Sequence, residues 1–334
     1  MLRHRLPLLI TGVAGVAGLN AFRYFHRKYA DQVIGIRPHQ TWKLNGPGIL
    51  AQDEKDPEGM RGLFDRFGFR SVLNGNGSCA LKSCELDPAM AYAVNVKSAV
   101  VLAALARRHD FRLVHLSSDL VFSGTRSGNH IETDATDPVT VYGKTMVQAE
   151  NVFAAETPRA AVLRISLPMG PSYNRHAGAI DWIQSRFRAH RPATLYFDEV
   201  RSSTYCDDLN GVFEKFLSNN ASGLFHCGGP QALTLYQIAQ VINRVGDYQP
   251  ELLKGCPRIE AGPMPPRAGD VSMNSGKLMA ELGAQPFQPW PFGADVQPTH
   301  RDWHGERPAD ERRSVEQISA RLYRYQAVES FAQI

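Results

Sequence analysis

The sequence has few cysteines, and no two of them are spaced for metal or redox chemistry. Its 334 residues include five cysteines, an odd number, with no C-x-x-C pair. This usage indicates free thiols in a reducing compartment rather than a disulfide framework. Cys79 and Cys84 are expected to be core or near-surface thiols, because no second ligand pair accompanies them, and no metal site is predicted.

An excess of charge of one sign is also lacking. The chain has 37 lysines and arginines against 33 aspartates and glutamates, a formal net charge of +4, and the basic residues are scattered among acids. This balance argues against a nucleic-acid partner and leaves room for small anionic ligands. A hydrophobic content of 43% and a charged content of 21% are ordinary for a soluble globular protein.

Long apolar runs are the third feature that the sequence is expected to lack. No window is expected to hold the roughly 18 apolar residues that a membrane span requires, so no membrane partner is predicted. The start of the chain, MLRHRLPLLITGVAGVAG, imitates a signal peptide. Glycines break its apolar part, however, and it runs into a basic, aromatic amphipathic segment. We therefore expect a cytoplasmic protein.

Short apolar runs alternate with helical patterns over the first 120 residues. Strands are predicted at 8–11, 32–36, 71–74 and 112–117. After the first strand, apolar residues recur at helical spacing, at Leu19, Phe22, Phe25 and Tyr29. Asp56-Pro57 and Asp87-Pro88 are helix starts, with Asp as N-cap and Pro first in the helix, and the second helix extends to about residue 108. These β/α units predict an α/β fold with a Rossmann-type doubly wound parallel sheet.

The alternation is looser from residue 168 onward. Strands are predicted at 194–197 and 224–227, helices at 207–217 and 234–244, and a loop at 255–269, which holds four prolines and three glycines. Thr234 and Gln237 form a capping box. We expect a dinucleotide-binding domain at 1–167, joined by some later segments, and a smaller, mainly substrate-binding α/β domain at 168–290.

A C-terminal extension at 291–334 is expected to contain one amphipathic helix. Ser314 and Gln317 form a second capping box. A narrow apolar stripe follows, made by Val315, Ile318, Leu322 and Tyr325. The stripe is expected to dock on the body of the protein or on a partner, either a second copy of the chain or another protein.

A G-x-x-G-x-x-G turn follows the first predicted strand. Gly12, Gly15 and Gly18 allow a tight turn into a helix and let the backbone approach a pyrophosphate, which then lies on the free N–H groups and the positive end of the helix dipole. Its place at the first βα junction favours dinucleotide binding. The alternative is that these glycines serve only close packing of the helix.

The end of the second strand bears on which dinucleotide binds. An acidic residue there would suit the ribose of NAD, but the chain has Arg37, and an arginine suits the 2′-phosphate of NADP. NADP(H) is therefore favoured over NAD(H). The alternative is an ordinary solvated arginine at the edge of the sheet.

Two hydroxyl groups are expected to meet at the cofactor crevice. The strand at 112–117 delivers Ser118 at its C-terminal end, and Tyr142 follows 24 residues later. The C-terminal ends of the strands border the crevice in a doubly wound sheet. The pair could donate two hydrogen bonds to a carbonyl oxygen.

Several motifs occur in order along the chain. The first half contains TGVAGVAG at 11–18, Asp53 after the third strand, AYAVNVKSAVVLA at 91–103, LVHLSSDLVFSG at 113–124 and VYGKT at 141–145. The second half contains LRIS at 163–166, DEVRSSTYCDDL at 198–209, LFHCGGPQALTLYQIA at 224–239 and RAGDVSMNSGKL at 267–278. From residue 6 to about residue 290 the chain resembles the extended short-chain dehydrogenase/reductases. The resemblance is specifically to the dTDP-4-dehydrorhamnose reductase group, which includes the β regulatory subunit of methionine adenosyltransferase.

The resemblance implies a reductase in which NADPH delivers hydride and the smaller domain holds a nucleotide sugar. It implies that Tyr142 donates the proton to the substrate carbonyl and that Ser118 assists. The implied cofactor contacts are Gly12, Ala14, Gly15, Val16, Gly18, Arg37, Asp53, Asn74, Gly75 and Asn76. The implied substrate contacts are Asp119, Arg201 and Thr204.

Two departures from the family pattern concern the site. Asn74-Gly75-Asn76-Gly77 stands where the family has Asn-Ala-Ala-Ala, and Met146 stands where the lysine of Y-x-x-x-K would follow Tyr142. That lysine binds the nicotinamide ribose and lowers the pKa of the phenol, and methionine does neither. Lys144 is a poor substitute, because two residues along a helix point to nearly opposite sides.

Two main functions therefore stay open. One is an NADPH-dependent reductase or epimerase acting on a keto group of a nucleotide sugar. The other is a catalytically weak or inactive NADP-binding regulatory or interaction subunit, favoured by Met146 and by the C-terminal stripe. A different chemistry on a sugar nucleotide is a third, smaller alternative.

Overall fold

A seven-stranded parallel sheet forms the centre of the computed structural model, which describes residues 2–307 and 314–324. The strand order is β11-β6-β5-β4-β1-β2-β3. The strands are β1 (Leu8–Thr11), β2 (Val33–Arg37), β3 (Ile49–Ala51), β4 (Ser71–Asn74), β5 (Arg112–Ser118), β6 (Ala161–Ile165) and β11 (Gly223–Cys227). The order reverses between β1 and β4, so the ligand crevice of such a sheet lies beyond the C-terminal ends of these two strands. The predicted Rossmann-type sheet is confirmed.

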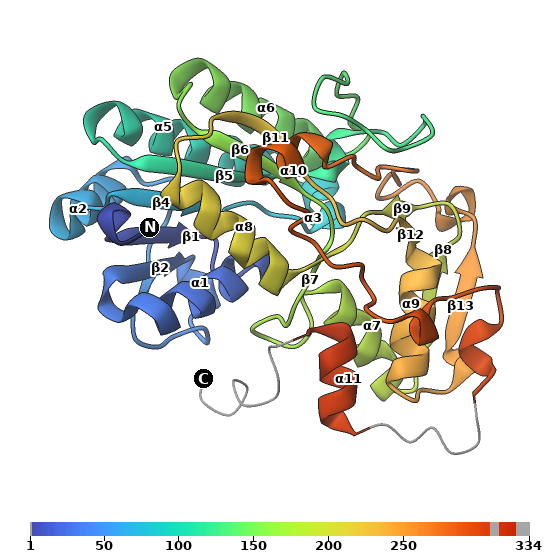
Figure 1. The fold of residues 1–334 in the computed structure, drawn as a ribbon. Coiled ribbons are helices and arrows are strands. Elements are labelled where there is room, and N and C mark those ends of the chain that lie inside the picture. Colours follow the sequence, from blue (N-terminus) through green and yellow to red (C-terminus); the bar gives the residue numbers. More distant parts are fainter. Residues whose placement is uncertain (1, 308–313, 325–334) are drawn as a thin grey trace.

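Helices cover both faces of this sheet (Figure 1). One face carries α1 (Val16–Tyr29), α8 (Cys206–Ser218) and α10 (Gly276–Leu282), and the other carries α2 (Pro57–Phe67), α5 (Ser98–Arg108) and α6 (Val141–Glu156). Helix α1 buries Leu19, Phe22 and Phe25, the residues at helical spacing in the sequence. The later helix α8 packs in the same core as α1, so a segment from the second half of the chain returns to the sheet.

The sequence signals for helix starts correspond to observed caps. The Asp56 side chain accepts a hydrogen bond from the Glu58 N–H at 3.1 Å, with Pro57 first in α2. Asp87 caps α4 (Pro88–Tyr92) in the same way. The helix predicted at 87–108 continues from α4 through a π-helical turn, Ala93–Lys97, into α5. Nothing in the local sequence predicted this π turn.

The composite helix Pro88–Arg108 corrects the prediction that the chain has no window apolar enough to span a membrane. By length and composition alone this helix could cross a bilayer, and half of its most apolar window is buried. Its apolar residues Ala99, Leu102 and Leu105 lie in the core under the sheet. The segment therefore packs as a core helix, although its length and composition are those of a membrane span.

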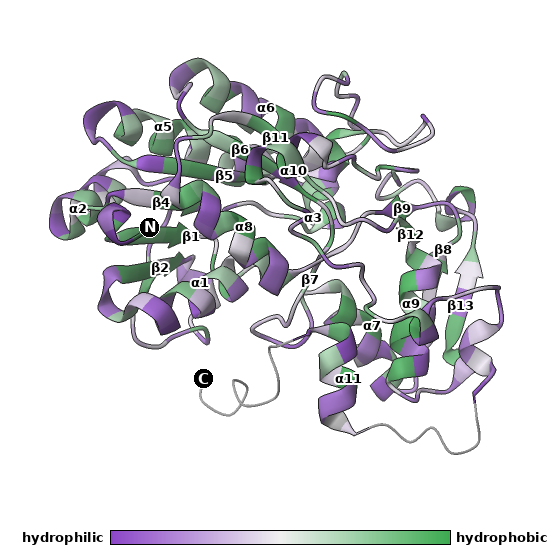
Figure 2. Cartoon of the chain, viewed as in Figure 1, coloured by the Kyte–Doolittle hydropathy of each residue, from purple (hydrophilic) through white to green (hydrophobic). Residues whose placement is uncertain are grey.

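A second lobe has its own hydrophobic core. It contains α7 (Ala179–Arg188), α9 (Leu235–Val245) and the parallel pair β8 (Ala193–Tyr196) and β13 (Leu253–Cys256). Its other strand pairs are β7 (Pro168–Met169) with β10 (Thr204–Tyr205) and β9 (Val200–Arg201) with β12 (Leu233–Thr234). Figure 2 shows many apolar residues on α9. This helix begins at the predicted Thr234–Gln237 capping box. The domain boundaries at 167/168 and 290/291 stay predictions.

Some smaller elements were not predicted. They are α3 (Leu81–Leu86) and 3-10 turns at Leu2–Arg5, Ala30–Gln32, His39–Thr41, Asp119–Val121, Pro250–Leu252, Arg258–Ala261, Ala294–Val296 and Trp303–Gly305. The sheet strand β6, the short strands β7, β9, β10 and β12, and the helices α7 and α10 were not predicted either. The predicted loop at 255–269 contains the end of β13 and one of these turns. Strand β13 has only four residues, one of them Gly255, so its periodic signal is weak.

The C-terminal extension packs on the second lobe. Helix α11 (Val315–Leu322) starts at the predicted Ser314–Gln317 capping box, and Leu322 is fully buried in the core of the second lobe. The Trp290 Nε1–H donates to the Leu322 carbonyl at 3.1 Å. Ile318 and Leu322 of the apolar stripe therefore dock on the body of the chain, while Tyr325 lies outside the described residues. Assembly with a second copy or a partner through this helix stays a prediction.

Arg112 connects the start of β5 to elements far away in the sequence. Its side chain is buried and donates to the Phe216 carbonyl at 2.8 Å, the Arg159 carbonyl at 2.7 Å and the Ala221 carbonyl. Burial lowers the pKa of Arg112 to about 10, so the guanidinium stays charged at neutral pH. This one cation holds the C-terminal end of α8 against the sheet.

The variant Arg112→Met should lower the free energy of unfolding by about 2–4 kcal/mol, because it leaves three carbonyl acceptors without their charged donor. Chemical denaturation would measure the loss. Arg159→Ala removes an exposed ion pair with Asp110 and serves as the control, with little expected change. Equal effects of the two variants would contradict the structural role of Arg112.

Candidate functional site

The glycine turn joins β1 to α1 at the reversal of the strand order. Gly12 has φ +66°, and a Cβ there would come within 2.2 Å of the Gly75 carbonyl oxygen. A Cβ on Gly18 would come within 2.4 Å of the Gly12 oxygen. Close packing therefore accounts for these two glycines. Gly15 is exposed and meets only ordinary contact, at 3.4 Å, so packing does not require glycine there.

The first turn of α1 is open to an anion. Gly15 is the N-cap of this helix and supplies no side-chain cap, and the first turn contains no acidic residue. The first N–H groups of a helix lack partners within it and carry partial positive charge. Ala14 and Val16 flank Gly15 and are partly exposed. The backbone at Gly15 therefore fits a phosphate group, which helix N-termini commonly bind.

Asn74 links three neighbouring strands, β1, β4 and β5, by side-chain hydrogen bonds. The Thr11 hydroxyl donates to Asn74 Oδ1 at 2.6 Å, and Asn74 Nδ2 lies 3.0 Å from His115 Nδ1. Burial lowers the pKa of His115 to about 3, so the ring is neutral and Nδ1 accepts from Asn74. Both groups of the Asn74 amide are therefore engaged within the protein, and this residue acts mainly on the shape of the crevice.

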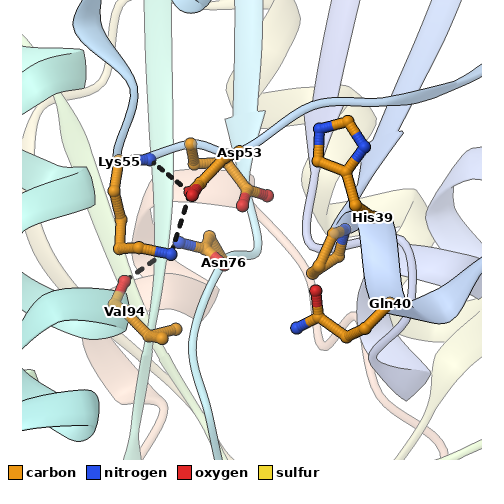
Figure 3. A pocket seen from close by; sticks show the side chains of 8 residues that line it. His39, Gln40, Asp53, Lys55, Asn76 and Val94 are labelled. Atoms are coloured by element: carbon orange, nitrogen blue, oxygen red, sulfur yellow. Dashed lines mark hydrogen bonds and ion pairs between the residues drawn. The ribbon is translucent and has the colours of Figure 1, made fainter.

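A small pocket of about 70 Å³ opens beside the glycine turn. Figure 3 shows His39 and Gln40 on one side of it, opposite Asp53, Lys55 and Asn76. The Asp53 carboxylate accepts from the Lys55 N–H at 2.9 Å and lies 2.9 Å from Lys55 Nζ. Asn76 Nδ2 donates to the Val94 carbonyl at 3.0 Å. The structure thus brings Asp53 and Asn76 together, as a shared cofactor role requires.

Arg37 is placed differently from the sequence expectation. Its Nε–H donates to the Leu44 carbonyl, and its Nη1 donates to the Pro38 carbonyl at 3.1 Å. The residues that line the pocket are Pro38, His39, Gln40, Asp53, Glu54, Lys55, Asn76 and Val94, so Arg37 is not among them. Its guanidinium supports the loop after β2, and its contact with a cofactor stays a prediction.

Glu54 is a pocket residue that the sequence reasoning missed. It is 6% exposed, and its Oε1 accepts from the Gly12 N–H at 3.3 Å. Burial raises the pKa of Glu54 to about 7. The only signal in the sequence was its position directly after Asp53. Its carboxyl group links the strand-three loop to the glycine turn.

Ser118 and Tyr142 meet at the C-terminal edge of β5. The Thr140 side chain caps α6 by accepting from the Gly143 N–H at 2.9 Å, which places Tyr142 in the first turn. The Ser118 side chain lies close enough to the Tyr142 phenol to lower its pKa, against the larger effect of burial. The Ser118 Oγ also lies 3.1 Å from Asp119 Oδ1 as a donor. Burial raises the pKa of Tyr142 well above its usual value, so the phenol is protonated at neutral pH.

Met146 packs under Tyr142 as an apolar residue. It is 2% exposed and belongs to a cluster with Tyr142, Cys84 and Phe122. A Cβ on Gly77 would lie 3.8 Å from Met146 Sδ, so the two departures from the family pattern are neighbours in space. This distance is an ordinary contact, so packing would tolerate alanine at position 77. Lys144 is exposed, as the helical geometry predicts.

Asn95, in the π turn, connects α6 to the loop after β4. Its Nδ2 donates to the Thr145 hydroxyl at 2.8 Å, and its Oδ1 accepts from the Ser78 N–H at 2.8 Å. The sequence reasoning did not single out this residue, although a lone amide in an apolar helix was a signal. The π turn therefore helps to position the wall beside Met146.

Asp119 and Arg201 belong to a buried charged network next to Ser118. Asp119 Oδ2 accepts from the Ser166 hydroxyl at 2.7 Å and lies 3.7 Å from Arg201 Nε. Arg201 Nη2 donates to Glu199 Oε1 at 2.6 Å. The guanidinium is thus shared by two carboxylates. A direct role of Arg201 toward a substrate stays a prediction.

Thr204 lies apart from that network. It is fully buried in β10, and its methyl group would lie 3.5 Å from a Cβ placed on Gly229. Within residues 2–307 and 314–324 its hydroxyl has no hydrogen-bond partner. The structure therefore does not bring Thr204 together with Tyr142, and its contact with a substrate stays a prediction.

Known proteins are similar to this chain over most of its length. The sequence model of the RmlD substrate binding domain family matches residues 6–294. A dTDP-4-dehydrorhamnose reductase of Aggregatibacter actinomycetemcomitans is 24% identical over 294 residues, which covers 84% of this chain and 94% of the relative. The methionine adenosyltransferase 2 subunit beta of Xenopus laevis is 24% identical over 237 residues, 69% of each chain. The resemblance that the motifs indicate is confirmed.

A solved structure has the same fold. The dTDP-4-dehydrorhamnose reductase of Bacillus anthracis, in complex with NADP, superposes with a TM-score of 0.73 at 17% identity. The match covers 85% of this chain and 95% of that chain. At this identity the likeness establishes the architecture, while the chemistry depends on the residues of the site.

Glu54 should make the stability of the protein depend on pH. The folded-state pKa of about 7 lies above the ordinary 4.5, so folding favours the neutral carboxyl. The contribution of Glu54 to the free energy of unfolding should be most favourable below about pH 4.5, and it should fall as pH rises through about 7. Glu54→Gln should therefore be more stable than the native chain at about pH 8, by about 1–3 kcal/mol, and equally stable near pH 4.5.

Chemical denaturation of both proteins across this pH range would measure the difference. The exposed Glu281→Gln, on α10, is the matched control and should shift stability by the same small amount at every pH. A pH-independent effect of Glu54→Gln would show that Glu54 is ionised in the fold.

Proposed function

The chain belongs to the RmlD substrate binding domain family, and we propose that it is an NADPH-dependent reductase, or epimerase and reductase, of a keto group on a nucleotide-activated sugar. The observation that carries this proposal is the buried Tyr142 side chain next to Ser118, at the edge of the sheet that borders the crevice. The relative from A. actinomycetemcomitans is a reductase of a dTDP sugar by its name, which supports the same substrate class.

The glycine turn and the neighbouring pocket fit a dinucleotide. The exposed N-terminus of α1 at Gly15 would hold the pyrophosphate, and the pocket beside Asp53 would hold the adenosine end. NADP(H) is favoured over NAD(H), because Lys55 neutralises Asp53 and His39 adds a donor at the pocket wall. NADPH, when bound, supplies the hydride.

Tyr142 is the proton donor in this proposal. Burial keeps its phenol protonated, so it can hydrogen-bond to a keto oxygen and transfer its proton as that oxygen gains charge. Ser118 lies beside the phenol, and Asp119 accepts from Ser118 and so fixes the direction of the serine hydroxyl. In this direction Ser118 has no proton for the phenolate that remains, and position 146 supplies no ammonium.

The missing ammonium supports a second candidate function. Met146 is buried where the family lysine would lower the pKa of the phenol, and burial raises that pKa instead. A high pKa weakens Tyr142 as an acid without affecting the cofactor pocket. A catalytically weak or inactive NADP-binding regulatory subunit is therefore the alternative, and the similarity to the methionine adenosyltransferase 2 subunit beta supports it.

The variant Tyr142→Phe should lower kcat/KM by about 10²–10⁴ with NADPH and dTDP-4-dehydrorhamnose, because it removes the proton donor. The fall in NADPH absorbance measures the rate. Tyr29→Phe is the control, since its hydroxyl donates to Glu214 on the far side of α1, and it should keep full activity. NADPH binding without turnover of any nucleotide sugar by the native chain would favour the regulatory subunit.

The variant Met146→Lys should raise kcat by about 10-fold or more if the missing cation limits the reaction, because an ammonium beside Tyr142 would lower the pKa of the phenol. Met146→Leu keeps the apolar packing without charge and should leave kcat unchanged. An unchanged rate in a folded Met146→Lys protein would show that the site works around methionine.

A further inference from the structure

The C-terminal extension reaches toward the glycine turn through one chain of hydrogen bonds. The family match ends at residue 294, while the described chain continues to 307 and resumes at 314–324. Figure 1 shows α11 beside α7, the helix that follows the loop at 170–178. Tyr323, directly after α11, is 8% exposed and lies in the core of the second lobe.

Tyr323 donates to a carboxylate that also holds the loop. Its hydroxyl donates to Asp181 Oδ1 at 2.6 Å, and Asp181, in the first turn of α7, is 5% exposed. Burial and the Asp181 carboxylate raise the pKa of Tyr323 well above its usual value, so the hydroxyl keeps its proton and donates. This bond fixes one oxygen of Asp181.

The other oxygen of Asp181 organises the loop at 170–178. Asp181 Oδ2 accepts from the Ser172 hydroxyl at 2.5 Å and from the Ser172 N–H at 2.7 Å. The Ser172 oxygen in turn accepts from the N–H groups of His176, at 3.0 Å, and Ala177, at 3.2 Å. Asn174 Oδ1 accepts from the same two N–H groups, at 3.0 and 2.9 Å. Ser172 and Asn174 therefore hold the loop together, and Asp181 fixes the side chain and the N–H of Ser172.

The same loop lies on the first turns of α1. Asn20 Nδ2 donates to the Pro171 carbonyl at 3.0 Å and to the Val16 carbonyl at 2.7 Å. A Cβ on Gly178 would come within 3.1 Å of Val16 Cγ2. Val16 is the first residue of α1, directly after Gly15, so the loop packs beside the backbone that fits a phosphate.

We propose that Tyr323, Asp181 and Ser172 are positioning residues by which the C-terminal extension holds the loop at 170–178 against the glycine turn and so sets the affinity for the dinucleotide. This proposal rests on the proposed NADPH binding. None of the three residues touches the reacting atoms, so their effect is on binding of the cofactor and not on proton transfer by Tyr142. The extension then acts within the chain on the cofactor site.

The test compares two tyrosines of the same core in the full-length protein. Tyr323→Phe keeps the ring and removes the hydrogen bond to Asp181, together with a longer one to Gln184 on the same helix, at 3.3 Å. Tyr236→Phe is the matched control, because Tyr236 is also 8% exposed in this core and its hydroxyl donates to the Arg301 carbonyl at 3.1 Å, away from the loop. Fluorescence titration with NADPH gives Kd, and thermal unfolding gives Tm for both variants.

The Kd for NADPH should rise about 3–10-fold in Tyr323→Phe and stay unchanged in Tyr236→Phe, with similar Tm values. Ser172→Ala removes the serine hydroxyl that Asp181 holds and should weaken NADPH binding as well. In the double variant with Tyr323→Phe, the loss of binding free energy should be smaller than the sum of the two single losses. If turnover is measured, KM for NADPH should rise while kcat and KM for the sugar stay the same.

Two results would overturn the proposal in distinguishable ways. Equal NADPH affinity in Tyr323→Phe and Tyr236→Phe would refute the role of the extension and leave the proposed function intact. Absence of NADPH binding by the native chain would refute the proposed function, and this inference with it.

Discussion

The close approach of Gly12 to the Gly75 carbonyl is the constraint on which the candidate site depends. No side chain fits between them, since a Cβ on Gly12 would come within 2.2 Å of that oxygen. The Thr11–Asn74 hydrogen bond joins the two strands at the same level. The ends of β1 and β4 are thereby fixed where the strand order reverses, which is where a doubly wound sheet binds its ligand. The first turn of α1 and the pocket beside Asn76 are both placed relative to this contact.

Electrostatics distinguishes the two halves of the crevice. On the cofactor side, an uncapped helix N-terminus and the Asp53–Lys55 pair leave a surface suited to an anion, with the buried Glu54 behind it. On the substrate side, Tyr142 is protonated and is surrounded by apolar groups and Ser118, without an ammonium at position 146. In the proposed reductase, cofactor binding and proton transfer therefore depend on different groups. A loss of catalysis at Met146 would leave cofactor binding intact, so both functions are compatible with one fold.

Several predictions succeeded because their signals are local. The buried strands are short apolar runs, and the Asp-Pro helix starts and the two capping boxes need only three or four consecutive residues. Others failed or were missed where distant segments decide the outcome. The contact of Arg37 with a phosphate stays a prediction, and its Nε and Nη1 donate to carbonyls of its own loop. Glu54 became a pocket residue only because the loop after β3 reaches the turn at Gly12. The apolar residues of the helix at 88–108 pack in the core beside the sheet. Its composition alone fits a membrane span equally well.

The sequence by itself determined the Rossmann-type sheet and the glycine turn, because apolar periodicity, turn chemistry and strand ends depend on neighbouring residues. It also showed that Met146 and Lys144 point to different sides of one helix. Only the tertiary structure decided that Met146 and Gly77 are neighbours, that Asn95 joins α6 to the loop after β4, and that Tyr323 reaches Asp181 across 142 residues of sequence. These contacts depend on how separate elements pack, and side-chain pairing between distant segments has no local sequence signal.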